Sequence, residues 1–293
     1  MNGRSTGFIG GLLLLLAGML PAAEIVKYPG IEIDIDKKEV RVEAELSAEL
    51  MWGEPVLEFL MMRGGERAYE TLFLTKTEPM HLQLGLIMLG MKPRPLDGTD
   101  AVAAEFSRVN KHPLTDEQVA ARADERKAQD AKPAGPCLVK VFVAWKTTAG
   151  EKTSPLEKFL KNRRVNGPAL PMPLLFNGSY FYNNDEGKNT FGASSSGIFI
   201  SMLQNPVALF NLPYAENSPY ADEPSGFSVK VDQLPSELTT GYKMEVADND
   251  GKVHMVERIV PKAAPVTVIF RPCDTPYEEA AKDPYAASAK PQE

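Results

Sequence analysis

The sequence predicts an α+β protein in which antiparallel strands and a few short helices form two packed segments joined by a polar helical insertion. Three observations lead to this prediction. Apolar and polar residues alternate with period two over residues 31–44, a helical pattern of apolar residues follows at 79–89, and four strand-like stretches lie between 227 and 270. Because a polar stretch at 97–136 separates the two β-rich parts, we expect the boundary there.

Residues 1–23 have the pattern of a secretory signal peptide. Arg4 precedes an apolar run from Gly7 to Leu20, and small residues follow. This run is shorter than the ~20 residues that span a bilayer, although a retained N-terminal anchor is the alternative reading. We therefore expect cleavage after Ala22 or Ala23, a periplasmic or extracellular protein, and no membrane span after cleavage.

The first segment, residues 24–96, is predicted to contain two hairpins and a helix. Residues 31–35 and 40–44 alternate as strands around a short polar turn. Residues 55–62 and 68–76 flank Gly64 and Gly65, which supply the positive φ of a tight hairpin. A helix is predicted at 79–89. Its signals are Thr77 as cap, Pro79 in the first turn, Leu82, Leu86 and Leu89 at helical spacing, and Gly90 at its end.

Residues 97–136 differ in character from both flanking parts. Thr115 and Gln118 have capping-box spacing and open a stretch of good helix formers in which Val119 is the only large aliphatic residue. A helix that is polar all round packs on little, so we expect an exposed connector.

The second segment, residues 137–273, is predicted to be rich in β-structure. A strand at 138–145 opens it, and four short strands near its end include a hairpin with Asp250-Gly251 at the turn. Residues 274–293 show no periodicity and are expected to form a disordered tail.

The two cysteines of the chain are predicted to form a disulfide between Cys137 and Cys273. An exported chain enters an oxidising compartment, where two cysteines are more often paired than free. Cys137 precedes the strand at 138–145, and Cys273 follows the strand at 266–270. If these strands are antiparallel neighbours, the cysteines come within bridging range.

Composition and charge exclude several functions. The chain has 293 residues, with 32 Lys and Arg against 39 Asp and Glu, for a net charge of −7. This balance is unlike the basic footprint of a nucleic-acid-binding protein. Two cysteines and three scattered histidines do not suffice for a four-cysteine zinc site, a zinc finger or an iron–sulfur framework. We therefore expect no metal, no cofactor and no nucleic-acid partner.

Three local motifs have a structural reading beside a functional one. Asp248–Gly251 begins like a calcium loop, but the later ligand positions hold Lys252 and Ile259, so a turn is favoured. The serines of 192–197 lack the flanking glycines of a nucleophile elbow. Asn177-Gly178-Ser179 matches a glycosylation acceptor and equally a turn, and we interpret it as a turn.

Part of the chain resembles a known family. In order and spacing, the stretches GIEIDIDKKEVRVEAEL, LEFLMM, GGERAYETLFL and EPMHLQLGLIMLGMKP resemble the YdjY-like proteins, which are exported bacterial proteins of uncharacterised function, common in planctomycete-type genomes. The similarity continues through VFVAW, LLFNGSYF, GIFISML and NPVALFNLP and covers most of residues 30–213. Some members carry a ferredoxin-like description, but a cluster needs four thiolates, so this property does not carry over.

The resemblance directs attention to Tyr69, Glu70 and His81. The family pattern is a His-Glu-Ser-Leu-like tetrapeptide on the strand before the helix and a histidine early in that helix. Here the tetrapeptide is Tyr-Glu-Thr-Leu, so Glu70 and His81 match while Tyr69 replaces the histidine. Glu and His alone rarely hold a metal, so no metal site is expected. We expect Glu70 and His81 to form a hydrogen bond, either as a structural pair or as a general-base pair.

The sequence therefore predicts an exported binding or structural module of the cell envelope, of the YdjY-like type, with an envelope partner or a small ligand. The alternative is an envelope enzyme, such as a hydrolase, that uses Glu70 and His81 with Tyr69. An open pocket with converging polar groups would favour the enzyme, and a buried satisfied pair would favour the module.

Overall fold

Eight strands of the protein close into a single barrel. The computed structural model describes residues 24–50, 56–65, 67–95, 115–131, 135–184, 186–202, 205–213 and 226–285. The barrel strands follow one another in the order β3, β18, β6, β10, β14, β13, β4 and β5, and β5 pairs back onto β3. Their bounds are β3 Glu39–Leu46, β18 Pro265–Cys273, β6 Leu138–Thr147, β10 Leu174–Phe176, β14 Phe210–Asn211, β13 Ile198–Ser201, β4 Phe59–Arg63 and β5 Thr71–Thr75.

The prediction of an α+β fold with two packed segments is wrong. The protein is mostly β, and strands from both predicted segments close together into one barrel, with β4, β5 and β3 of the first beside β18, β6, β10, β14 and β13 of the second. β3 pairs antiparallel with β18, and β4 pairs antiparallel with β13. Apolar side chains line these strands, and closing the sheet buries them together while removing unpaired strand edges.

The core of the barrel is continuous across the two predicted segments. Val40 and Val42 of β3, together with Val268 and Phe270 of β18, belong to one buried cluster. Phe210 stacks on Phe270 with ring centroids 5.1 Å apart and an angle of 15° between the rings. Fully burying side chains of this size contributes about 1.5 to 3 kcal/mol each, so the barrel is the main source of stability.

Short strands extend the barrel or lie beside it. β1 and β2 pair as a hairpin that continues the sheet beyond β3, and β7 pairs with β6. The others form small sheets of their own. Their bounds are β1 Ile25–Tyr28, β2 Ile31–Asp34, β7 Gly150–Pro155, β8 Leu160–Asn162, β9 Gly167–Pro168, β11 Phe181–Asn183, β12 Asn189–Phe191 and β15 Phe227–Val229.

The expected hairpin around Gly64 and Gly65 is a parallel pair instead. Both glycines adopt positive φ, 56° and 113°, as expected. The chain then turns back through the 3₁₀-helix η1 (Ala68–Glu70) before β5 begins. β5 consequently runs parallel to β4, with Phe59 opposite Thr71 and Arg63 opposite Thr75.

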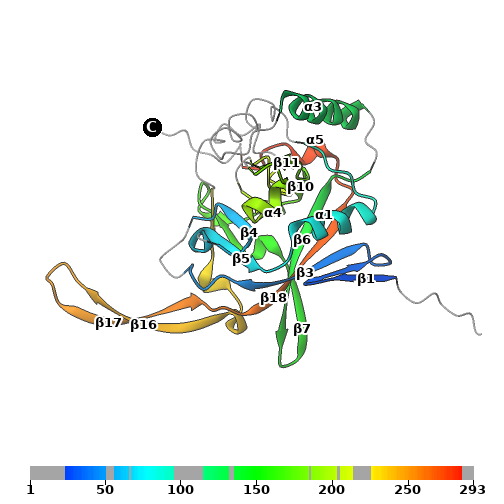
Figure 1. Cartoon of the computed structure of the whole chain (residues 1–293). Helices are drawn as coiled ribbons and strands as arrows, with labels where there is room; N and C mark the ends of the chain where they lie inside the picture. The colour runs from blue at the N-terminus through cyan, green and yellow to red at the C-terminus, as the bar shows by residue number, and fades with distance from the viewer. Residues whose placement is uncertain are drawn as a thin grey trace, which may run out of the picture.

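The helices lie outside the barrel (Figure 1). α1 (Pro79–Met88) confirms the predicted helix, although Glu78 rather than Thr77 occupies its N-cap position. α3 (Asp116–Ala131) starts with the predicted capping box: Thr115 and Gln118 exchange backbone-to-side-chain hydrogen bonds of 3.0 and 3.2 Å. The remaining helical turns are η2 Leu156–Phe159, α4 Gly192–Ser196, η3 Val231–Gln233, η4 Ser236–Leu238 and α5 Tyr277–Ala280. Each helix in the described part of the chain is too short or too polar to cross a membrane.

The structure has no disulfide between Cys137 and Cys273. The underlying strand pairing is confirmed, since β6 and β18 are antiparallel neighbours. The register places Leu138, and not Cys137, opposite Cys273. Successive side chains of a strand point to opposite faces, so a shift of one residue turns the two sulfurs apart. The Cys273 sulfur instead lies 2.9 Å from the hydroxyl of Thr275.

The sequence predicts a signal peptide at one end of the chain and a disordered tail at the other. The proposed signal peptide, residues 1–23, lies outside the described residues. Residues 274–285 fall in the stretch expected to be disordered, yet they contain α5 and the buried Tyr285. The Tyr285 hydroxyl accepts a hydrogen bond of 2.8 Å from the backbone N–H of Leu170, which ties this stretch to the chain just after β9.

A long hairpin of β16 (Thr239–Ala247) and β17 (Val253–Pro261) confirms the predicted turn at Asp250-Gly251. The hairpin stands away from the barrel as an arm (Figure 1). Most of its residues are exposed; Met244 and Val246 are half-buried, and Val260 and Pro261 are buried at the base.

Candidate functional site

Glu70 and His81 do not meet. Glu70 ends η1 immediately before β5, and His81 lies in the first turn of α1, after β5 has ended. A five-residue strand at about 3.3 Å per residue separates them by roughly 16 Å. No hydrogen bond joins their side chains. The expected Glu70–His81 contact is therefore wrong, because the two residues flank opposite ends of the same strand.

Glu70 is part of a structural ion pair. Its carboxylate accepts a hydrogen bond from Arg67, which also pairs with Glu58 and lies over the ring of Phe59, 4.6 Å from its centroid. Partial burial of Arg67 opposes its charge, but Glu70 and Glu58 together raise the pKa of its guanidinium. Tyr69, the neighbour of Glu70, is 56% exposed.

His81 packs as an aromatic side chain. Its ring stacks on Tyr28 of β1, with centroids 4.8 Å apart and an interplanar angle of 19°. Its Nδ1 atom is buried and has no hydrogen-bond partner. A general base needs a positioned proton acceptor near the reacting group. Among the described residues, no carboxylate forms a hydrogen bond or ion pair with His81, and its stacking on Tyr28 holds α1 against β1.

The serine-rich turn at 192–197 forms α4 and contacts the start of α1. Ser194 donates a hydrogen bond to one carboxylate oxygen of Glu78, and Arg63 donates to the other. The Tyr182 hydroxyl donates to Ser195 over 2.8 Å. No histidine in the described part of the chain bonds to either serine, and the bond from Ser194 to Glu78 docks α4 on α1, as the structural reading of this motif implies.

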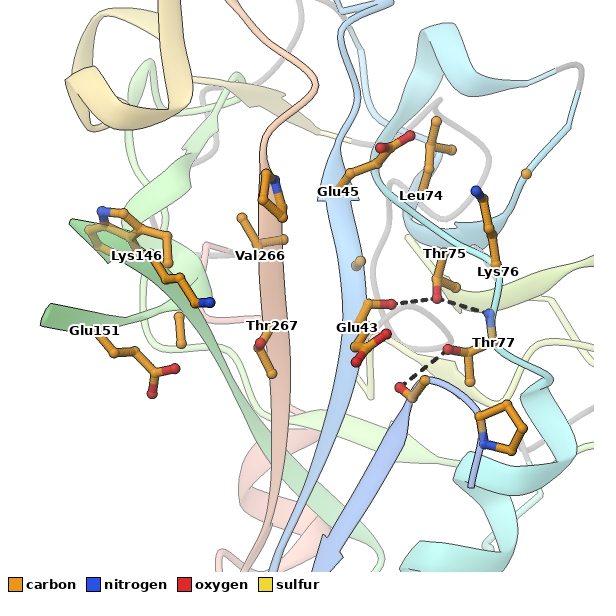
Figure 2. Close-up of a pocket in the computed structure, with 17 residues that line it drawn as sticks. Glu43, Glu45, Leu74, Thr75, Lys76, Thr77, Lys146, Glu151, Val266 and Thr267 are labelled. Atoms are coloured by element: carbon orange, nitrogen blue, oxygen red, sulfur yellow. Dashed lines mark hydrogen bonds between the residues drawn. The ribbon is translucent and has the colours of Figure 1, made fainter. Parts of the chain in front are cut away.

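An open groove on the outer face of the barrel is the strongest candidate site. Its volume is about 620 Å³, which lies within the range of ordinary ligand pockets. Figure 2 shows β3 and β18 as neighbouring strands under the groove, with Glu43 on β3 and Thr267 on β18. β6 and Glu151, the second residue of β7, border one side of the groove, and the chain from Leu74 to Thr77 borders the other.

The groove lies where β3 changes neighbours. The first half of β3 pairs with β2, and its end pairs with β5. Glu43 spans the change: its backbone N–H donates to the carbonyl of Gly30 (2.9 Å), and its carbonyl accepts from the Thr75 hydroxyl (2.6 Å). The Thr77 hydroxyl donates to the same Gly30 carbonyl (3.3 Å). These bonds, drawn in part in Figure 2, hold the β1–β2 hairpin and the end of β5 together.

Gly30 is required at this junction. Its φ is +73°, which disfavours other residues, and an added Cβ would lie 2.4 Å from the Thr77 hydroxyl oxygen. The close approach therefore fixes the edge of the groove.

Four exposed charged side chains line the groove without ion-pair partners among the described residues. Glu43 and Glu45 lie on β3, and Figure 2 shows them between Lys146 on β6 and Lys76 after β5. Each of the four is exposed. By contrast, Glu151 is engaged: it accepts two hydrogen bonds of 2.8 and 2.9 Å from Arg41. The groove thus presents two carboxylates flanked by two ammonium groups.

The apolar part of the groove comes from Trp145, Val266, Ala44 and Leu74. Trp145 is 8% exposed and packs edge-on against Phe159, with centroids 5.9 Å apart. A groove with an apolar base and a few charged groups has the general composition of a binding site.

The sequence did not single out Glu43, Glu45, Lys76 or Lys146. Each occupies a polar position of an alternating or exposed stretch, which is typical of any solvent-facing residue. Three segments distant in sequence bring them together, so no local motif marks the site. Among the described residues, no group of three or more His, Cys, Asp or Glu side chains is arranged to hold a metal ion.

Comparison with known proteins gives a family and no closer relative. Neither the curated proteins nor the solved structures yield a match. The YdjY domain family matches residues 31–270, a range that runs from β2 into β18 and includes all or part of every strand of the barrel. By this match over most of its length, the chain belongs to the YdjY domain family.

Proposed function

We propose that the protein is an exported binding module of the cell envelope, and that the groove over β3, β18 and β6 is its binding surface. The observation that carries this proposal is the set of four charged side chains that surround an apolar base without ion-pair partners in the described chain. The apparent signal peptide at residues 1–23 supports export.

The charges indicate the class of ligand. Lys146 and Lys76 lie on opposite sides of Glu43 and Glu45, so a bound molecule meets both signs of charge within one groove. A ligand with a cationic and an anionic group complements this arrangement, whereas a ligand of one charge meets repulsion. A short extended peptide that bears an acidic and a basic side chain has this chemistry and fits an open groove.

The enzyme alternative receives no support from Tyr69, Glu70 and His81. It requires these side chains to converge on one pocket, but Glu70 is paired with Arg67, His81 is stacked on Tyr28, and neither lines the groove. The binding module is therefore the function that the geometry favours.

Peptide titration tests the proposal. The mature chain is titrated with the capped tetrapeptide Glu-Ala-Ala-Lys, and binding is measured by calorimetry. The uncharged counterpart is Gln-Ala-Ala-Gln. We expect binding of the charged peptide only, and a loss of about tenfold or more in affinity for Glu43→Gln with Lys146→Gln. The control variant, Glu278→Gln, removes an exposed carboxylate on α5 and leaves binding unchanged. Equal binding of both peptides, or no binding of the charged one, contradicts the proposed ligand class.

Export has its own test. When the full chain is expressed in a Gram-negative host, the protein should appear in the periplasmic or extracellular fraction, and its intact mass should lack residues 1–22 or 1–23. A full-length protein retained in the membrane fraction would support an anchor instead.

A further inference from the structure

The arm formed by β16 and β17 has exposed apolar side chains and unpaired edges. It forms a two-stranded sheet that no other described strand joins. Its large exposed apolar side chains are Tyr242, Val253, Met255, Val256 and Ile259. A two-stranded ribbon is at best marginally stable in water, and a free edge is a template for another strand. The arm therefore offers an edge and a face to a further strand.

The sequence of β16 is self-complementary around Met244. From 241 to 247 it reads Gly-Tyr-Lys-Met-Glu-Val-Ala. In an antiparallel pair related by a two-fold axis at Met244, Lys243 of each copy lies opposite Glu245 of the other. Tyr242 likewise lies opposite Val246, which is a favourable aromatic–β-branched pair. Small residues, Gly241 and Ala247, oppose each other at the ends.

The charged side chains of this edge, Lys243 and Glu245, can pair with a second copy. Lys243 and Glu245 form no ion pair among the described residues, although Lys243 lies opposite Glu257 in the hairpin register. β17 lacks the same symmetry. Centred on its middle residue, Glu257, it would place this carboxylate opposite its own copy and Val256 opposite Arg258. Charge complementarity therefore selects the edge of β16 and selects a second copy of this chain as the partner.

We propose that two copies of the protein associate through the free edges of β16, forming a four-stranded antiparallel sheet with a two-fold axis at Met244. The backbone groups of the edge form a new ladder, and two Lys243–Glu245 ion pairs set its register. Such an isologous interface closes at two copies, because each edge is used once.

Charge reversal tests the register. Sedimentation velocity of the mature chain over a concentration series should show a monomer–dimer equilibrium. Lys243→Glu should weaken the dimer by about tenfold or more, since it places like charges opposite each other twice. The double variant Lys243→Glu with Glu245→Lys restores complementarity and should restore dimerisation.

Glu257→Lys is the matched control, because it also places like charges opposite each other at the Lys243–Glu257 position of the hairpin but leaves the β16 edge unchanged. It should dimerise like the parent. A monomeric parent at all concentrations, or equal effects of Lys243→Glu and Glu257→Lys, overturns the proposal.

Cross-linking gives a second test that does not depend on charge. Residues opposite each other in an antiparallel pair have Cα atoms about 4.5 to 5.5 Å apart, which is within disulfide range. Met244→Cys should therefore form a disulfide-linked dimer on oxidation, whereas the parent and Met255→Cys on β17 should not. If Met255→Cys formed the disulfide-linked dimer and Met244→Cys did not, the contact would lie on β17, and association through β16 would be refuted.

Discussion

The carboxylate of Glu39 provides a quantitative test of how the barrel is held together. Its side chain is only 2% exposed at the start of β3, and Arg271 of β18 binds it with bonds of 2.8 and 2.9 Å. Arg41 lies 3.4 Å from its other oxygen. Burial opposes charge on Arg41, but Glu151 and Glu39 raise the pKa of its guanidinium, so the group stays charged.

Glu39→Ala should lower the free energy of unfolding by about 2 to 3 kcal/mol. Breaking one partner of a buried ion pair costs about 3 to 5 kcal/mol. The expected loss lies at or below the lower end of this range for two reasons: Arg271 is 43% exposed and regains water, and Arg41 keeps its bonds to Glu151.

Urea unfolding at neutral pH measures this change, with an unchanged m-value showing that the comparison is valid. Glu151→Ala is the control, because its side chain is 47% exposed and an exposed pair contributes about 1 kcal/mol or less. A loss below about 0.5 kcal/mol for Glu39→Ala, or a loss equal to that of the control, would refute this reasoning.

Three further predictions concern stability. Asn211→Ala should cost about 3 kcal/mol in urea unfolding, because this fully buried amide bonds both Asn177 and Asn205, whose groups then lose their partners; an unchanged midpoint would show that water replaces it. Trp145→Phe should leave the melting temperature equal or higher, because the indole N–H is buried without a partner. Trp145→Ala should instead lower the free energy of unfolding by about 3 to 5 kcal/mol. Similar losses of stability for both variants would contradict this. Asp34 has its pKa lowered from 3.8 by its hydrogen bonds from Lys37, so Asp34→Asn should destabilise the protein near neutral pH, and this difference should shrink as the pH falls below 3.8; a difference independent of pH would rule out the ion pair as its source.

Local patterns predicted many elements correctly. The alternation in β2 and β3, the capping box of α3, the proline and glycine that bound α1, and the Asp250-Gly251 turn all depend on residues close in sequence. The antiparallel pairing of β6 and β18, which the disulfide prediction assumed, is also present. In each case, local backbone preferences and the final fold agree.

The barrel closure could not be predicted in this way. It depends on β10 with three residues and β14 with two, which are too short to show a period. It also depends on the turn back through η1, which makes β4 and β5 parallel, although the two glycines alone favour a hairpin. The strand register was equally out of reach, and a shift of one residue separated Cys137 from Cys273.

The candidate site was missed for a related reason. Glu43 and Lys146 belong to strands about a hundred residues apart in sequence, and each occupies an ordinary solvent-facing position. Glu70 and His81 drew attention through a family pattern, but the strand between them holds them apart.

The central claim is that the groove over β3, β18 and β6 binds a peptide with both signs of charge. Amide hydrogen exchange of the mature chain, with and without Glu-Ala-Ala-Lys, tests it most directly. The claim predicts that the peptide slows exchange in β3 and in the chain from Leu74 to Thr77, while the arm of β16 and β17 is unaffected. Protection confined to other elements, or no protection at saturating peptide, would contradict it.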